Sequence, residues 1–395
     1  MTNKANRWLL PDGVDELLPP RAKQLETLRR AILDLYCSWG YDLIKTSLIE
    51  FLDSLLIVPS QELQLNTCEI VDQLSGKTMG VRADISSQAA RIDAHVLQQE
   101  GPTRLCYADS VLRTRPRGPL GSRSPQLIGA ELYGHSGMES DVEVVSLLLH
   151  TLAVAGIHEP LLALGHSRIC RILLEAAALE AEQTERLFNA LQNKASADIA
   201  QLLSEQPVPA QLHGCLTRLP SLHGGLEVLD TAAQLFDGID PALNTALAEL
   251  RAITRALADS FPAQILHIDL CELRGYDYHT GVIFSAYVAG HGEAIANGGR
   301  YDAIGAVFGR RRAATGFDAD LKTLLNLSRH TFAAQPKVFA PAGNDAALKR
   351  CIDGLRQQGR RVIQGFSTDP AEARALDCAE WLVRDGDDWR LDALA

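Results

Sequence analysis

The sequence predicts an α+β protein that combines a β-rich core, a helical insertion and a small α/β tail. Apolar and polar residues alternate over residues 266–270 and again over 282–288, a pattern typical of two neighbouring antiparallel strands. Residues 168–260 are instead rich in alanine and leucine at helical spacing. Residues 336–395 show a strand–helix–strand order and end in a hairpin pattern. We therefore expect more than one domain in this chain.

Composition and charge narrow the class of protein. The chain has 395 residues, of which 46% are hydrophobic and 22% charged, which favours a globular protein of two or three domains. No apolar run approaches the ~20 residues that span a bilayer. The net charge of −11 argues against a nucleic-acid partner, because a polyanion needs a basic surface. The 8 cysteines are scattered without metal-ligand spacing, so we expect a cytoplasmic protein with reduced thiols, no metal and no cofactor.

The first hundred residues predict one long helix and several short strands. Apolar residues spaced three and four apart follow Pro19-Pro20, and Gly40 ends this helix. An extended segment at 41–50 and a strand near 68–74 come next. Residues 81–98 read as a strand end that passes into a helix, at whose start Asp84 and Ser86 could simply be capping residues.

An arginine-rich hairpin is predicted at 104–134. Its loop carries several arginines among proline and glycine, including Arg113 and Arg115. Arginines that face each other across a hairpin can hold a carboxylate or phosphate through paired, charge-assisted hydrogen bonds. From these residues alone, a solvated basic loop is an equally good interpretation. A helix at 140–155 and a short strand near 161–167 follow the hairpin.

The block at 168–260 predicts an all-helical insertion. Its last helix begins at Asp240-Pro241 and has one apolar stripe. The core is therefore split into residues 1–167 and 261–330, and Gln335-Pro336 resembles a linker to the tail at 336–395. His213 and His223 stand alone in the block, which favours surface or packing roles over metal binding.

The stretch from Arg274 to Asp302 is the candidate for a binding site. Arg274, Asp277, Tyr278 and His279 lie between the two alternating runs, and a glycine pair follows at 298–299, where the backbone can approach a ligand closely. An arginine, an acid and two ring side chains at a sheet end suit a small zwitterion. A charged hairpin tip is the plainer interpretation of the same residues.

The motifs in residues 10–327, taken in order, resemble the catalytic core of class II aminoacyl-tRNA synthetases, specifically histidyl-tRNA synthetase. The resemblance rests on LPDGVDELLP, GYDLIKTSLIE, VRADIS, the arginine hairpin, RGYDYHTGVIF and NGGRYD with ATGFDADLKTL. It implies a mixed, mostly antiparallel sheet flanked by helices.

Three positions of the family's motifs, two of which contact ATP, carry other residues here. Ser47 stands at the proline of the first motif, and Arg115 stands at the acid that contacts adenine. Thr323 stands at the arginine of the third motif that contacts ATP, and the tail is smaller than the family's anticodon-binding domain. The resemblance therefore implies no adenylate formation and no catalytic residue, because charge that develops during that reaction would lack its fixed partners.

The amino-acid side of the family's pocket is better matched. By resemblance, Asp84 and Ser86 hold an α-amino group and Glu131 contacts an imidazole ring. Arg113 matches the arginine that contacts both the α-phosphate and the carboxylate. His279 replaces a tyrosine of the signature, and Leu127 stands where the family has a glutamine. The residues of the resulting histidine-like pocket are Asp84, Ser86, Arg113, Glu131, Arg274, Tyr278 and His279.

A synthetase-like core with altered ATP groups, an acidic surface and a short tail is similar to the regulatory subunits of ATP phosphoribosyltransferase. That resemblance implies a non-catalytic partner of the short-form catalytic subunit in the first step of histidine biosynthesis. It also implies feedback regulation by histidine and a homodimer within a larger hetero-oligomer. Two alternatives remain open: an active histidyl-tRNA synthetase-like enzyme that activates an amino acid, and a homodimeric sensor of another amino acid.

Overall fold

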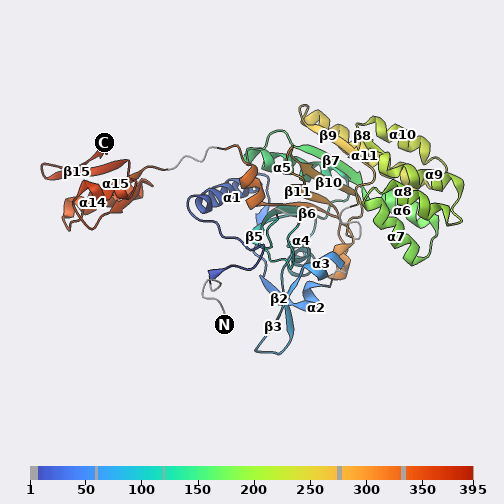
Figure 1. Ribbon diagram of the computed structural model, residues 1–395, viewed down its shortest axis with the longest axis horizontal. Coiled ribbons are helices and arrows are strands. Elements are labelled where there is room, and N and C mark those ends of the chain that lie inside the picture. The colour runs from blue at the N-terminus through green and yellow to red at the C-terminus, as the bar shows by residue number, and fades with distance from the viewer. Residues whose placement is uncertain (1–7, 58–60, 119–120, 274–277, 331–334, 395) are drawn as a thin grey trace. The chain divides into compact units, whose positions relative to one another are not determined.

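The chain forms two compact units, residues 1–330 and 331–395 (Figure 1). The computed structural model describes residues 8–57, 61–118, 121–273, 278–330 and 335–394. No helix in these ranges is long and apolar enough to cross a membrane. The predicted linker at Gln335-Pro336 falls at the start of the second unit.

A nine-stranded mixed sheet forms the centre of the first unit. Its neighbours pair antiparallel except β1 with β5 and β7 with β9, which are parallel. The sheet is therefore mostly antiparallel, as the resemblance to class II synthetases implied. In spatial order its strands are β1 (Asp42–Leu43), β5 (Thr103–Ser110), β6 (Gln126–Tyr133), β12 (Ala314–Asp320), β11 (Ala296–Arg300), β10 (Val282–Tyr287), β7 (Leu161–His166), β9 (Ile265–Asp269) and β8 (His223–Gly224).

β9 and β10 come before and after the sequence RGYDYHTG (274–281), which we call the signature segment. These two strands were predicted to be neighbours, and the structure shows that they are not. β9 and β10 run antiparallel, but β7 lies between them and pairs with both, with Leu164 opposite Phe284 on one side and Ile268 on the other. An alternating pattern shows that a segment is a strand but does not name its partner. β7 is a buried central strand that lies about 100 positions before β9 in the sequence. The partners of β9 and β10 are therefore decided by a segment that is distant in the sequence.

Helices cover one face of the sheet and leave the other face for the cavity. α1 (Arg21–Ser38) ends just before Gly40, whose φ is +80°, and packs with α5 (Met138–Val154) and α13 (Leu321–Leu327). The ring of Tyr36 on α1 meets Phe317 on β12 edge-on, with the ring centroids 6.1 Å apart. Gly316 is the neighbour of Phe317 along β12, so it faces the opposite side of the sheet. This alternation turns Glu131, which pairs with Gly316, away from α1.

A small three-stranded sheet lies beside the start of α4. The strand expected near 68–74 is present, and the segment after 81 passes into helix as predicted. The helix then changes to a π-helix, η2 (Ile92–Leu97), which the sequence pattern did not indicate. The elements of this region are β2 (Ile49–Phe51), β4 (Thr78–Val81), β3 (Cys68–Val71), α2 (Leu52–Leu55), α3 (Gln61–Asn66), α4 (Ser86–Arg91) and, packed against α4, α12 (Ile304–Val307).

The block after β7 is helical. The Asp240 side chain accepts a hydrogen bond from the Ala242 amide at the start of α11, and the stripe that includes Leu243, Leu250 and Leu257 is buried. The block also contains the short strand β8, and its status as an insertion remains our interpretation. Its helices are α6 (Ser167–Ala177), α7 (Ala181–Gln192), α8 (Ser196–Ser204), α9 (Ala210–Arg218), the 3₁₀ turn η3 (Leu219–Ser221), α10 (Glu227–Leu235) and α11 (Pro241–Ser260).

The second unit has its own sheet and core. Its strands follow the order β14-β13-β15-β16, with only the last pair antiparallel. One core cluster contains Val338, Leu348 and Leu382, all buried. Its elements are β13 (Lys337–Ala340), α14 (Ala346–Gln357), β14 (Arg361–Gln364), α15 (Pro370–Ala375), β15 (Glu380–Asp385) and β16 (Asp388–Ala393).

Candidate functional site

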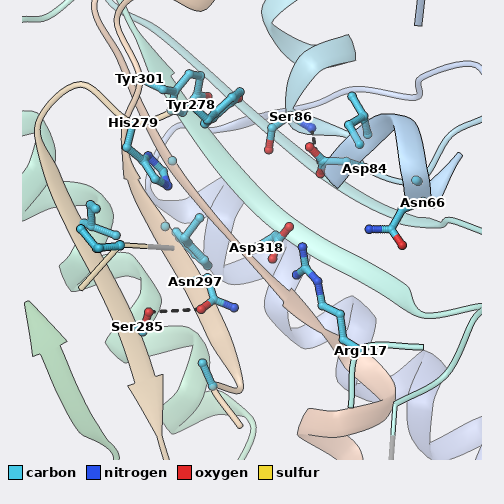
Figure 2. Close-up of a pocket in the computed structure, with 18 of the residues that line it drawn as sticks. Asn66, Asp84, Ser86, Arg117, Tyr278, His279, Ser285, Asn297, Tyr301 and Asp318 are labelled. Carbon is cyan, nitrogen blue, oxygen red and sulfur yellow. Dashed lines mark hydrogen bonds between the residues drawn. The ribbon is translucent and has the colours of Figure 1, made fainter. Parts of the chain in front are cut away.

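A cavity of about 840 Å³ lies over the central strands of the nine-stranded sheet (Figure 2). β6, β10, β11 and β12 supply its floor. The start of α4, the end of α3 and the helix α7 supply its walls. The cavity is therefore built from segments that span more than 250 positions of the sequence, from Leu63 to Asp318.

Glu131 is the buried acid of the cavity floor. Its side chain accepts hydrogen bonds from the Ser86 hydroxyl at 2.7 Å, from the Tyr107 hydroxyl at 3.1 Å and from the Tyr301 hydroxyl. The carboxylate lies directly over Gly316, where a Cβ atom would come within 1.6 Å of Oε2. Only glycine at position 316 leaves room for this carboxylate.

Burial changes the charge of Glu131. Loss of hydration raises the pKa of its carboxyl group to about 8, and the nearby Asp84 carboxylate adds to the rise. Hydrogen bonds from Ser86, Tyr301 and Tyr107 act in the opposite direction. The group therefore takes up or releases a proton near neutral pH, so it can pair with either a donor or an acceptor of a ligand.

Two further acids and two arginines line the same cavity as Glu131. Asp84 is half-buried at the start of α4, where its carboxylate accepts a hydrogen bond from the Ile85 amide at 2.7 Å. Burial and Asp84 together raise the pKa of Asp318 to about 6, while Arg117 and Arg113 lower it. Figure 2 shows the Arg117 guanidinium beside Asp318. The cavity thus holds both signs of charge, as a zwitterionic ligand requires.

Aromatic rings close one end of the cavity. Tyr278 stacks on Tyr301 with ring centroids 4.8 Å apart, and its hydroxyl oxygen is buried without a hydrogen-bond partner in the described chain. Burial lowers the pKa of His279 to about 4, so its ring is neutral at pH 7. The His279 Nδ1 atom lies 3.3 Å from the Arg300 carbonyl oxygen, to which it donates. Its Nε2 atom is then left as an acceptor.

Six of the seven predicted pocket residues line this one cavity, and Arg274, like Asp277, lies outside the described residues. Asp318 also lines the cavity but was not predicted, although an acid in the middle of an apolar strand could have signalled it. Tyr301, which ends the NGGRY motif, and the contribution of α7 were not predicted either. The six predicted residues that line the cavity are Asp84, Ser86, Arg113, Glu131, Tyr278 and His279.

Arg115 and Thr323, which replace ATP-contacting residues of the synthetase motifs, have other surroundings here. Arg115 is exposed and does not line the cavity. The Thr323 hydroxyl donates to the Asp320 carboxylate at 3.0 Å, and Lys322 binds Asp15 at 2.9 Å. No cluster of three or more histidine, cysteine, aspartate or glutamate side chains suited to a metal ion occurs within the described ranges.

Comparison with known proteins decides the family. The sequence model described as histidyl-tRNA synthetase matches residues 13–324, and that of the ATP phosphoribosyltransferase subunit HisZ C-terminal domain matches residues 335–392. An ATP phosphoribosyltransferase regulatory subunit of Thioalkalivibrio sulfidiphilus is 50% identical over 96% of this chain and 97% of that protein. The chain belongs to the family of ATP phosphoribosyltransferase regulatory subunits. A second family member, from Chromohalobacter salexigens, is 48% identical over 99% of both chains.

Solved structures agree with this family and its fold. A Bacillus halodurans C protein described as an ATP phosphoribosyltransferase regulatory subunit/histidyl-tRNA synthetase is 25% identical, with a TM-score of 0.84 over 95% of this chain and 97% of that chain. A histidyl-tRNA synthetase from Nostoc sp. PCC 7120 is 17% identical, with a TM-score of 0.78 over 98% of this chain and 97% of that chain. The second likeness shows the fold alone, which is the class II synthetase fold that the motifs predicted.

Proposed function

We propose that this chain is a non-catalytic regulatory subunit that assembles with a short-form catalytic subunit of ATP phosphoribosyltransferase and senses histidine in its cavity. The family name supports the assignment to histidine biosynthesis. The observation that carries the sensing role is the buried Glu131 beneath the cavity, with Asp84 and the two arginines beside it.

The charges in the cavity suit histidine. A ring nitrogen of the ligand would meet Glu131, which accepts from a protonated imidazole when ionised and donates to a neutral one when protonated. The ligand's ammonium group would lie near Asp84, and its carboxylate near Arg113 and Arg117. Each contact replaces hydration that the polar groups lose on binding, so a ligand that lacks one of them is disfavoured.

The missing ATP contacts support a role without catalysis. Thr323 is tied to Asp320 and has no positive charge to offer a phosphate, and Arg115 is exposed outside the cavity. A protein that binds histidine without reacting with it can still regulate a partner, provided that histidine binds two states of the complex with different affinities. A homodimer within a hetero-oligomer would let two such sites act together.

A paired assay tests this function. Purified chain should show no histidine-dependent ATP–pyrophosphate exchange, and a short-form catalytic subunit should gain ATP phosphoribosyltransferase activity when this chain is added. Histidine should inhibit the mixture. Robust exchange by this chain alone would instead make it an amino-acid-activating enzyme.

Glu131 provides the matched test of the histidine site. Glu131→Ala removes the acid, and Glu131→Gln keeps its shape, so a loss of histidine inhibition in both variants points to the carboxyl group itself. Glu185→Ala, an exposed glutamate of α7 that does not line the cavity, is the control and should leave inhibition unchanged. Unchanged inhibition in the Glu131 variants would place the histidine site elsewhere.

A further inference from the structure

One face of α7 borders the cavity that the sheet residues form. Phe188, Asn189 and Gln192 lie in the last five residues of this helix and line the cavity. Asn189 and Gln192 are exposed, and neither carboxamide makes a hydrogen bond within the described chain. These two side chains add neutral donors and acceptors to the wall of a cavity whose floor carries charged groups.

The helices of the block differ in their main packing partners. α11 packs against β7, α5 and α6, whereas α7 packs mainly against α8. The helix also lies between two non-glycine residues in the left-handed region, Ala178 at φ 48° and Lys194 at φ 51°. Such residues are uncommon and mark points where the chain turns sharply. The main packing partners of α7 and α8 are other helices of the block: α8 for α7, and α7 and α9 for α8.

Two contacts tie the end of α7 to the strand that precedes the signature segment. Lys194 pairs with Asp269 at 2.6 Å, and the Cys271 thiol donates to the Leu191 carbonyl at 3.3 Å. The far end of the signature segment is held by α6, where Arg171 donates to the His279 carbonyl at 3.1 Å. The helical block therefore contacts the chain both before the signature segment, at Asp269 and Cys271, and within it, at His279.

We propose that Asn189 and Gln192 bind the polar groups of the amino-acid ligand, so that occupancy of the cavity draws α7 onto the sheet and passes the signal to the helical block. This inference rests on the proposed histidine binding. It adds a route by which histidine in the cavity affects the helical block. A ligand that bridges the floor and α7 stabilises the arrangement in which both contact it, which is the differential affinity that regulation needs.

The test combines calorimetry with hydrogen–deuterium exchange on the full-length chain, using L-histidine as the probe. Histidine should slow amide exchange in β6, β12 and also in residues 181–192. Asn189→Ala/Gln192→Ala should weaken histidine binding about tenfold, which corresponds to about 1.4 kcal/mol. In this variant, histidine at saturation should still protect the sheet but no longer protect α7.

Gln201→Ala is the matched control, because it removes an exposed carboxamide from α8 that does not line the cavity. It should keep both the affinity and the protection of α7. If histidine binds the unaltered chain and protects the sheet while exchange in α7 stays the same, the role of α7 is wrong and the proposed function stands. If calorimetry detects no histidine binding, this inference and the sensing part of the proposed function are both overturned, while activation of the catalytic subunit is judged separately by the paired assay.

Discussion

At the scale of single residues, the cavity depends on a close fit between a carboxylate and a bare backbone. Glu131 and Gly316 are paired across β6 and β12, and the glycine leaves the space that the carboxylate occupies. The carboxylate is satisfied by three hydroxyl donors, so its burial does not leave an unpaired polar group.

Gly316→Ala should damage the cavity more than its small volume suggests. The new methyl group would lie 1.6 Å from Oε2 of Glu131, so the carboxylate must move and lose its hydroxyl donors. We expect a loss of at least tenfold in histidine affinity by calorimetry and a destabilisation of about 1–3 kcal/mol in denaturant unfolding. Gly214→Ala on α9, where nothing lies within 4 Å of the new Cβ, should be neutral or slightly stabilising. Equal behaviour of the two variants would contradict the fit.

Glu131→Gln should change how stability depends on pH. The pKa of Glu131 is raised to about 8 in the folded chain from an ordinary value of 4.5, so the folded state holds this proton more tightly than the unfolded state. The stability from this proton is present below pH 4.5 and is lost as the pH rises towards 8. The unfolding free energy of the unaltered chain should therefore fall relative to that of Glu131→Gln between pH 5 and 8.5, by an amount on the order of a few kcal/mol. Denaturant titrations of both proteins at several pH values measure this difference, and a constant difference would mean that Glu131 has an ordinary pKa.

At the scale of elements, helix ends follow local rules while helix placement does not. Asp240, Asp320, Asp345 and Asp369 each cap the start of a helix through a hydrogen bond to the amide two residues on. These caps satisfy amides that have no partner within their own helix. The faces that the helices bury are set by the strands and helices that they meet.

Asp240→Ala should weaken α11. The Asp240 carboxylate lies 2.7 Å from the Ala242 amide, and removal of such a cap costs about 1 kcal/mol. Chemical denaturation of the full chain should show this loss, and Asp240→Asn, which keeps an oxygen acceptor, should recover most of it. If both variants unfold alike and below the unaltered chain, the charge rather than the hydrogen bond stabilises this helix end.

At the scale of the whole molecule, two units with separate cores share one chain. The cavity lies within the first unit, and the clusters around Val338 and Phe339 belong to residues of the second unit. Each unit therefore has the apolar core that an independent domain requires.

Leu348→Ala should affect the second unit selectively. Leu348 is 1% exposed within its cluster, and such a truncation costs about 2–5 kcal/mol. Hydrogen exchange should become faster in residues 337–393, while exchange in the nine-stranded sheet and histidine binding stay the same. Phe366→Ala, at a side chain that is 97% exposed, is the control and should change neither. Faster exchange in both units would show that they unfold together.

The sequence by itself determined what depends on neighbours along the chain. The α1 helix with its stop at Gly40, the apolar stripe of α11, the β5–β6 hairpin and the class II fold could all be predicted, because periodicity, caps and motif order are local signals. Tertiary structure decided the pairings and the membership of the cavity. β7 separates β9 from β10, and Asp318 and α7 join the cavity, because burial and strand partners depend on segments that only the folded chain brings together.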